Sequence, residues 1–152
     1  MLKEIDKRAL SFQHLQYSRI HAYMYKSHPL AGKSSLHLNE ITQYPYISYD
    51  DESDISSSKY TNSILQWNNN NQVLAVSDRA TAYYLLSCLP AYTTGSGYLS
   101  EDEKNRGIVA IPIDGMESIE IGWIKQRNRL LPEIAMEYID ILTKDSEAMR
   151  KT

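Results

Sequence analysis

The sequence predicts an α/β fold in which a mixed, mostly parallel sheet is flanked by helices. Short apolar runs typical of strands alternate along the chain with segments whose apolar residues recur at helical spacing. The 152 residues are enough for one domain with a core, and 42% hydrophobic with 23% charged residues is typical of a globular protein. Residues 73–97 show the pattern most clearly, as strand, helix and strand in succession.

Within this stretch, the β-branched run Val73–Val76 predicts a short strand buried on both faces. Ser77 and Asp78 are residue types that cap helix N-termini, and the helix after them is expected to end at Pro90. Residues 91–94 predict another strand. The apolar stripe of the helix is formed by Ala82, Leu85, Leu86 and Leu89.

Ser77, Asp78 and Arg79 are therefore expected at a ligand-binding crevice. In open α/β sheets, ligands bind beyond the carboxyl ends of the strands, where helix N-termini present free N–H groups. The alternative is an ordinary capped helix with a solvated Asp–Arg pair.

The other elements follow from the same patterns. Alternating or apolar runs predict strands at residues 19–25, 46–49, 108–113 and 119–124. Capping residues and helical spacing predict helices that begin at Ser35, at residues 56–58 and at Pro132, the last with an apolar stripe within residues 131–142. We expect residues 1–18 to lack a regular period, residues 50–54 to form an acidic loop, residues 68–71 a turn, residues 100–107 a charged loop with a helical turn, and the tail from Asp145 to fray.

Composition excludes several classes of function. A formal net charge of −3 argues against binding of DNA by this chain alone. The single cysteine, Cys88, excludes an intrachain disulfide and a cysteine-based metal site, and its place inside a helix predicts a buried, inert thiol. No signal peptide and no long apolar run is present, so we expect a cytoplasmic protein without membrane contact.

We expect no enzymatic activity, no metal and no cofactor. The four histidines, at positions 14, 21, 28 and 37, do not have the spacing of a metal pair. No nucleophile elbow, phosphate loop or dinucleotide fingerprint occurs. The acidic run at residues 50–52 is expected to be a solvated turn rather than an acid–base pair.

The order of motifs resembles that of LysR-type transcriptional regulators. Lys26-Ser27-His28-Pro29-Leu30-Ala31-Gly32 is followed by a short helix and then by Tyr44-Pro45-Tyr46-Ile47. Ile111-Pro112, the strand 119–125 and the helix 131–143 follow downstream. The resemblance covers about residues 12–144. Where relatives often carry Gly-x-Gly after the central helix, this chain has Leu89-Pro90-Ala91, with Gly95 and Gly97 later.

The resemblance implies part of an effector-binding domain similar to type 2 periplasmic binding proteins, which have two lobes joined by crossing strands. Residues 1–25 would be a remnant of the first lobe and residues 26–122 the second lobe. Residues 123–144 would return to the first lobe, and 145–152 would be a tail. The chain would then be a C-terminal fragment, with DNA bound only through a helix-turn-helix domain that these residues do not contain.

The resemblance also places the effector-binding residues in three loops at strand ends. These are Ser48, Tyr49 and Asp50, then Ser77, Asp78, Arg79 and Ala80, then Tyr92, Thr93 and Thr94. Arg79 could bind a carboxylate in bidentate fashion, whereas Asp50 and Asp78 could instead select an amine or sugar hydroxyls. The alternative for each is turn chemistry or an exposed charge.

The resulting interpretation is a regulatory domain that senses a small polar metabolite, for which a carboxylate is one candidate, in a homo-oligomer. Two other interpretations remain open: a stand-alone solute-binding lobe or transport component, and an enzyme using the same cleft. Residues 19–25 and 131–142 carry apolar faces whose partners in the family are missing here. We therefore expect self-association through these segments, or mobile residues 1–18.

Overall fold

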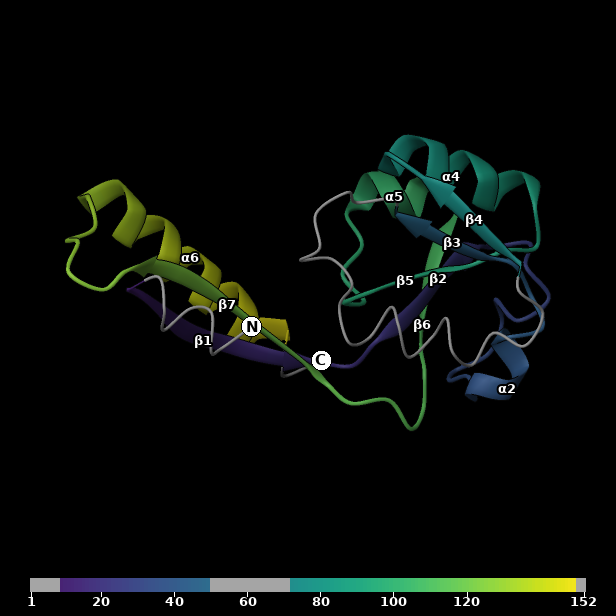
Figure 1. Ribbon diagram of the computed structural model, residues 1–152, viewed down its shortest axis with the longest axis horizontal. Helices are drawn as coiled ribbons and strands as arrows, with labels where there is room; N and C mark the ends of the chain where they lie inside the picture. Colours follow the sequence, from purple (N-terminus) through teal and green to yellow (C-terminus); the bar gives the residue numbers. More distant parts are fainter. Residues whose placement is uncertain (1–8, 50–71, 150–152) are drawn as a thin grey trace. The chain divides into compact units, whose positions relative to one another are not determined.

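The computed structural model describes residues 9–49 and 72–149 (Figure 1). In chain order the elements are β1 (Leu10–Ser18), β2 (His21–Tyr25), α2 (Leu38–Ile41), β3 (Tyr46–Tyr49), β4 (Val73–Val76), α4 (Arg79–Cys88), β5 (Thr93–Gly95), α5 (Glu101–Asn105), β6 (Ile108–Pro112), β7 (Ile119–Gln126) and α6 (Glu133–Met149). The expected acidic loop, the helix near residues 56–58, the asparagine turn and the candidate Asp50 lie outside the described residues.

The chain divides into two compact units. Unit 1 contains residues 1–18 and 119–152, and unit 2 contains residues 19–118. The expected lobe boundaries fell after residues 25 and 122. The observed boundaries lie a few residues earlier because β2 pairs with β5 and β6 inside unit 2, and β7 pairs with β1 inside unit 1. The assignment of these units to the two lobes of the family stays a prediction.

Unit 2 contains a mixed sheet in which the described strands follow the order β4-β3-β5-β2-β6. β3 and β4 pair in parallel, and Tyr92 joins β3 to the start of β5 through a parallel bridge to Tyr46. β2 pairs antiparallel with both β5 and β6. Four of these five strands therefore run in one direction, and β2 alone runs in the other. The predicted α/β fold class with a mixed, mostly parallel sheet is confirmed in this unit.

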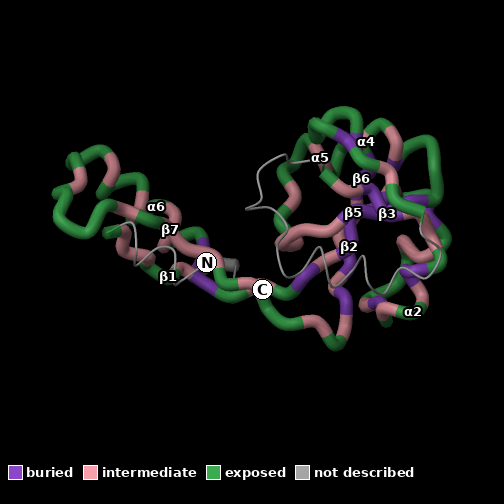
Figure 2. Tube along the Cα trace, viewed as in Figure 1, coloured by how far each residue is buried: buried purple, intermediate pink, exposed green. Residues whose placement is uncertain are grey.

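One cluster of the core of unit 2 lies between the sheet and α4. Ala82 and Leu86 of α4 pack with Ile47, Val76 and strand residues on the same face, and Figure 2 shows buried residues concentrated in these strands. The expectation that β4 is buried on both faces was wrong, since Val73 and Ala75 are exposed. β4 is at the end of the strand order, and its inward residues face the α4 side.

Two short helices of unit 2 begin at residues that cap them. α2 begins after His37 rather than Ser35, and the His37 N–H donates to Glu40 Oε2 at 3.0 Å. Leu36, which was expected in that helix, precedes it and forms a parallel bridge with Ile113. α5 begins after Ser100, whose backbone N–H donates to Glu103 Oε2 at 2.6 Å. At both ends a Glu at the third helical position accepts the N–H of the residue before the helix; its own N–H donates to the Ser100 hydroxyl at α5 and to the His37 carbonyl oxygen at α2.

Unit 1 consists of the antiparallel ladder of β1 and β7, with α6 packed on it (Figure 1). β1 was not predicted from the sequence. Gly122 of β7 lies under Phe12, and a Cβ at this position would lie 2.2 Å from the Gln13 carbonyl oxygen. α6 continues to Met149, so the expectation of a frayed tail from Asp145 was wrong; Ser146 is buried and donates to the Thr143 carbonyl oxygen at 2.8 Å.

The chain passes between the units twice, and the two passages lie next to each other within each unit. Ser18 pairs with Ile119 at the end of the β1–β7 ladder. In unit 2, the Ile113 N–H donates to the Ile20 carbonyl oxygen at 2.9 Å. Among the described residues, no helix is long and apolar enough to cross a membrane.

Candidate functional site

The structure brings the described residues of the three predicted loop segments to one edge of the unit 2 sheet. Tyr49 at the end of β3 is level with Val76 at the end of β4. The Ile47 N–H donates to the Tyr92 carbonyl oxygen at 2.8 Å, so the start of β5 runs alongside β3 in the same direction. The carboxyl ends of the three strands therefore meet, with the N-terminus of α4 directly after β4.

Asp78 caps α4, as predicted. Its carboxylate accepts bonds from the Thr81 N–H at 2.9 Å and from the Thr81 hydroxyl at 2.7 Å. These bonds favour the ionised form, and they hold the pKa of Asp78 below its ordinary value. Ser77 and Ala80 on either side are exposed. The carboxylate of Asp78 is thus occupied by its own helix, which favours the structural role over the selection of an amine.

Arg79 belongs to a cluster of charged and phenolic side chains on the α4 side of the sheet, which we call the Arg79 cluster: Tyr49, Arg79, Tyr83 and Glu103. Arg79 Nη1 lies 3.5 Å from Glu103 Oε1, and the Tyr83 hydroxyl donates to the same oxygen at 2.5 Å. The Arg79 side chain is 73% exposed, whereas that of Glu103 is 13% exposed. The Arg79 guanidinium is therefore open to solvent, whereas its partner, the Glu103 carboxylate, is largely buried.

The electrostatics of the Arg79 cluster keep Glu103 ionised. The bond from Tyr83 is the largest effect lowering the pKa of Glu103, and bonds from Ser100 add to it. Burial and this same carboxylate raise the pKa of Tyr83. Burial also raises the pKa of Tyr49, and the neighbouring Arg79 offsets part of that rise. One negative and one positive charge remain, so the cluster is close to neutral.

Sequence reasoning missed Tyr83 and Glu103. A usable pattern was present for Glu103, because Ser100 followed by Glu103 matches the capping box and predicts a helix start in this segment. That pattern fixes the local turn, but it gives no indication that α5 places the carboxylate beside Arg79.

Of the remaining candidates, Ser48, Tyr92 and Thr94 lie on the opposite face of the sheet, whereas Thr93 pairs with Tyr23 and lies on the α4 side. The Tyr46 hydroxyl lies 3.1 Å from Thr94 Oγ1, and the Tyr46 and Tyr92 rings are 5.2 Å apart between centroids. Tyr92 and Thr93 are fully buried, and burial raises the pKa of Tyr92. Ser48 alternates with Tyr49 along β3 and so points away from the Arg79 cluster. The predicted site residues share one edge of the sheet but divide between its two faces.

Gly95 and Gly97 shape the wall that follows β5. The Gly97 N–H donates to the Tyr23 hydroxyl at 2.8 Å, and the Tyr23 hydroxyl donates to the Tyr98 carbonyl oxygen at 3.1 Å. Gly97 has a φ of 88°, a conformation that side chains disfavour. Gly95 and Gly97 thus allow the chain to pack closely against β2, six residues after the positions of the Gly-x-Gly in the family pattern.

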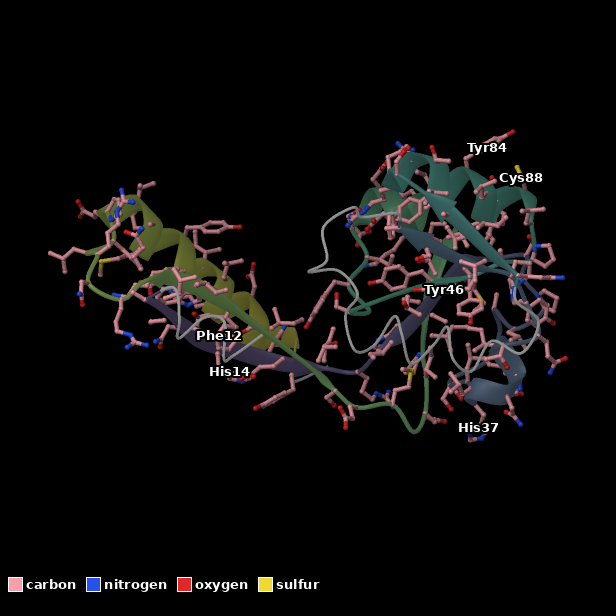
Figure 3. All side chains as sticks on the ribbon, in the orientation of Figure 1. Phe12, His14, His37, Tyr46, Tyr84 and Cys88 are labelled. Atoms are coloured by element: carbon pink, nitrogen blue, oxygen red, sulfur yellow. The ribbon has the colours of Figure 1, made fainter. Side chains whose placement is uncertain are left out.

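Cys88 differs from the prediction. It is exposed at the end of α4, and Figure 3 shows Cys88 and Tyr84 directed away from the sheet. The helix turns its inner face, marked by Ala82 and Leu86, toward the core, which leaves position 88 on the outer side. In the part of the chain that the structure describes, no group of three or more His, Cys, Asp or Glu side chains could hold a metal ion.

Comparisons with known proteins define the class of fold. Neither models of protein families nor curated protein sequences match the chain. Solved structures do match, and they include LysR-family transcriptional regulators and their effector-binding domains. The chain therefore has the fold of LysR-type effector-binding domains, and the predicted resemblance is confirmed at the level of the fold.

Three of these structures illustrate the likeness. HinK, a LysR family transcriptional regulator from Pseudomonas aeruginosa, is 13% identical, with a TM-score of 0.66 over 91% of this chain and 48% of its own. The effector-binding domain of QuiR in complex with shikimate is 15% identical, with a TM-score of 0.64 over 92% and 66%. The effector-binding domain of BenM with its effector benzoate is 14% identical, with a TM-score of 0.67 over 95% and 66%. The chain spans about half the length of HinK.

Proposed function

We propose that this chain is the regulatory, effector-binding part of a LysR-type transcriptional regulator and that it acts without catalysis. The observation that carries the proposal is the likeness of fold along 91% of the chain to regulators of this type. The effector is a small polar molecule bound at the edge where β3, β4 and β5 end. DNA contact and assembly with further copies belong to the whole regulator.

A carboxylate is the effector class that Arg79 favours. QuiR and BenM are similar in fold and were solved with shikimate and benzoate, both of which are carboxylates at neutral pH. The Arg79 guanidinium is 73% exposed, and its pairing with Glu103 spans 3.5 Å. Because the guanidinium is exposed to water and Glu103 also accepts a bond from Tyr83, a ligand carboxylate can engage Arg79 without leaving Glu103 unpaired.

Regulation requires that the effector binds one arrangement of the protein better than another. The effector would stabilise one arrangement of unit 2, which two segments of the chain connect to unit 1. That arrangement would be transmitted to DNA-binding domains carried elsewhere in the regulator. The structure supports this proposal through the doubled connection at residues 18–20 and 113–119.

The test is a thermal-shift titration of this chain with benzoate, shikimate and uncharged analogues of each. A ligand at a hundredfold excess over its dissociation constant stabilises the folded state by about 2.7 kcal/mol, so even weak binding is measurable. Arg79→Ala should abolish the shift. Arg106→Ala is the matched control, because Arg106 is also exposed and pairs with Asp102 on the neighbouring α5.

A carboxylate shift that is lost in Arg79→Ala and kept in Arg106→Ala supports the proposed site. A shift that survives Arg79→Ala would remove Arg79 from the site. Turnover of any of these compounds by the chain would contradict the regulatory, non-catalytic role.

A further inference from the structure

An open pocket in unit 1 is lined by residues of β7, of helix α6 and of the turn that joins them (Figure 1). Its volume is about 340 Å³, which falls within the range of about 300–1,000 Å³ that is typical of small-molecule sites. Five of its seven lining residues are apolar: Trp123 from β7, Leu130 and Leu131 from the turn, and Met136 and Ile139 from α6. The pocket is therefore suited to the apolar part of a small molecule.

The periods of the two elements explain why these side chains meet at one pocket. Trp123 and Lys125 are two residues apart on β7, so they lie on the same face of the strand, and both are half-buried. Met136, Ile139 and Asp140 occupy positions i, i+3 and i+4 of α6 and so share one side of the helix. The strand and the helix thus form two facing walls.

The two charged residues of the lining carry opposite charges on opposite walls. Lys125 belongs to the β7 wall and Asp140 to the α6 wall. The Lys125 ammonium lies 3.5 Å from the Arg129 carbonyl oxygen, which is a long hydrogen bond. Among the residues that the structure describes, neither charge has an oppositely charged partner.

This pair of charges distinguishes between classes of apolar ligand. A carboxylate alone would bring a negative charge toward Asp140 as well as toward Lys125, and an amine alone would bring a positive charge toward both. A ligand that carries both groups offers each wall the opposite charge, and charge-assisted hydrogen bonds are stronger than neutral ones. Because the lysine stem is flexible, its ammonium can reach a carboxylate that lies next to the ligand's own ammonium.

We propose that this pocket binds an apolar α-amino acid, whose carboxylate pairs with Lys125 and whose ammonium pairs with Asp140. The side chain of the amino acid lies against Trp123 and Ile139. All the lining residues belong to unit 1, so the proposal goes beyond the effector site proposed at Arg79 and does not depend on it.

The first experiment measures binding to the wild-type chain by isothermal titration calorimetry, with L-phenylalanine and L-leucine as probes. 3-Phenylpropionate lacks the ammonium of phenylalanine, 2-phenylethylamine lacks its carboxylate, and L-serine lacks an apolar side chain. Each of these three compounds should bind about tenfold more weakly than phenylalanine or worse, because each loses one of the three interactions.

The second experiment removes each charge of the pocket while keeping the size of the side chain. Lys125→Met and Asp140→Asn should each weaken the binding of phenylalanine about tenfold. Lys144→Met and Asp145→Asn are the matched controls, since both residues are exposed on α6 and neither lines the pocket. Both control variants should bind phenylalanine as tightly as the wild type does, and circular dichroism should show unchanged folding in all four.

The third experiment uses fluorescence to show whether phenylalanine enters this pocket. Trp67→Phe leaves Trp123 as the only tryptophan of the chain. Phenylalanine is not excited at the wavelengths that excite tryptophan, so any change reports on Trp123 itself. The emission of Trp123 should change on titration with phenylalanine, with the dissociation constant that calorimetry gives.

A chain that binds neither amino acid would overturn the proposal, and so would analogues that bind as tightly as phenylalanine. Binding that is lost in Arg79→Ala and kept in Asp140→Asn would place the amino acid at the effector site and remove it from this pocket. An emission of Trp123 that changes with protein concentration but not with phenylalanine would show that a second copy of the chain fills the pocket instead.

Discussion

Substitution of Gly97 by alanine tests how the wall of the candidate site is held against β2. Gly97 combines a φ of 88° with close packing, since a Cβ there would lie 2.5 Å from Nδ1 of His21. Two other glycines allow the cost of the positive φ to be measured apart from the cost of the close packing. Gly115 has a φ of 79° with nothing within 4 Å of an added Cβ, and Gly32 has open space without a positive φ.

The three substitutions should form a graded series. Gly32→Ala should leave the free energy of unfolding unchanged or raise it by about 0.4–1 kcal/mol, because alanine restricts the unfolded chain. Gly115→Ala should lower it by about 1–2 kcal/mol, the cost of a left-handed conformation for a side chain. Gly97→Ala should carry the same cost and should also displace the His21 ring, whose Nδ1 lies 2.8 Å from the Arg19 carbonyl oxygen. Because this hydrogen bond would be disturbed, we expect the free energy of unfolding to fall by a further 1 kcal/mol or more, on the order of one hydrogen bond.

Urea unfolding followed by circular dichroism measures the series, provided that the dependence on denaturant is the same for all variants. The total for Gly97→Ala is expected at about 2–4 kcal/mol. If Gly97→Ala and Gly115→Ala cost the same, packing against β2 contributes nothing and the reasoning fails. If Gly32→Ala is as costly as either, the open space described around it is wrong.

Three further outcomes are expected. Tyr83→Phe should lower the free energy of unfolding by about 1.5–3 kcal/mol through loss of the bond to Glu103, while Tyr84→Phe should have no effect; equal effects in urea unfolding would contradict the bond. Cys88 should react with a thiol reagent in the folded protein nearly as fast as in the denatured chain, and strong protection would show that it is buried after all. Burial lowers the pKa of His28 below 6.5, so the unfolded state binds the proton more readily and stability should fall as the pH drops from above 6.5 toward the folded pKa. His28→Asn should reduce this slope, leaving a part from His21, and an unchanged slope would refute the assignment.

Much of the fold was accessible from the sequence because local chemistry and tertiary structure agree there. The caps and periods around Asp78 and in residues 133–142 predicted α4 and α6, and apolar alternation predicted β2. β1 was missed because a register shift between His14 and Gln16 interrupts its two-residue alternation. A bulge of this kind depends on pairing with β7, more than 100 residues away, and leaves no local pattern.

The candidate site was predictable only in part for a similar reason. Strand ends that meet at one edge follow from the α/β topology, so the segments containing Tyr49, Arg79 and Thr94 could be named. The pairing of Arg79 with Glu103 could not, because it depends on where α5 packs. The burial of Tyr92 and Thr93 and the exposure of Cys88 depend on the rotation of each element about its own axis, which the sequence of that element constrains only weakly.

The pairing of Ser18 with Ile119 has a consequence for how this protein can be taken apart. In connectivity, unit 2 is the loop of a β-hairpin whose arms are β1 and β7. Closing a long loop costs only slightly more entropy than closing a short one, so such a large insertion is tolerated. The ends of unit 2 are joined by their own hydrogen bond between Ile20 and Ile113. We therefore expect that unit 2 can be excised and inserted into another protein. A two-residue turn in its place would leave β1 and β7 as an ordinary hairpin.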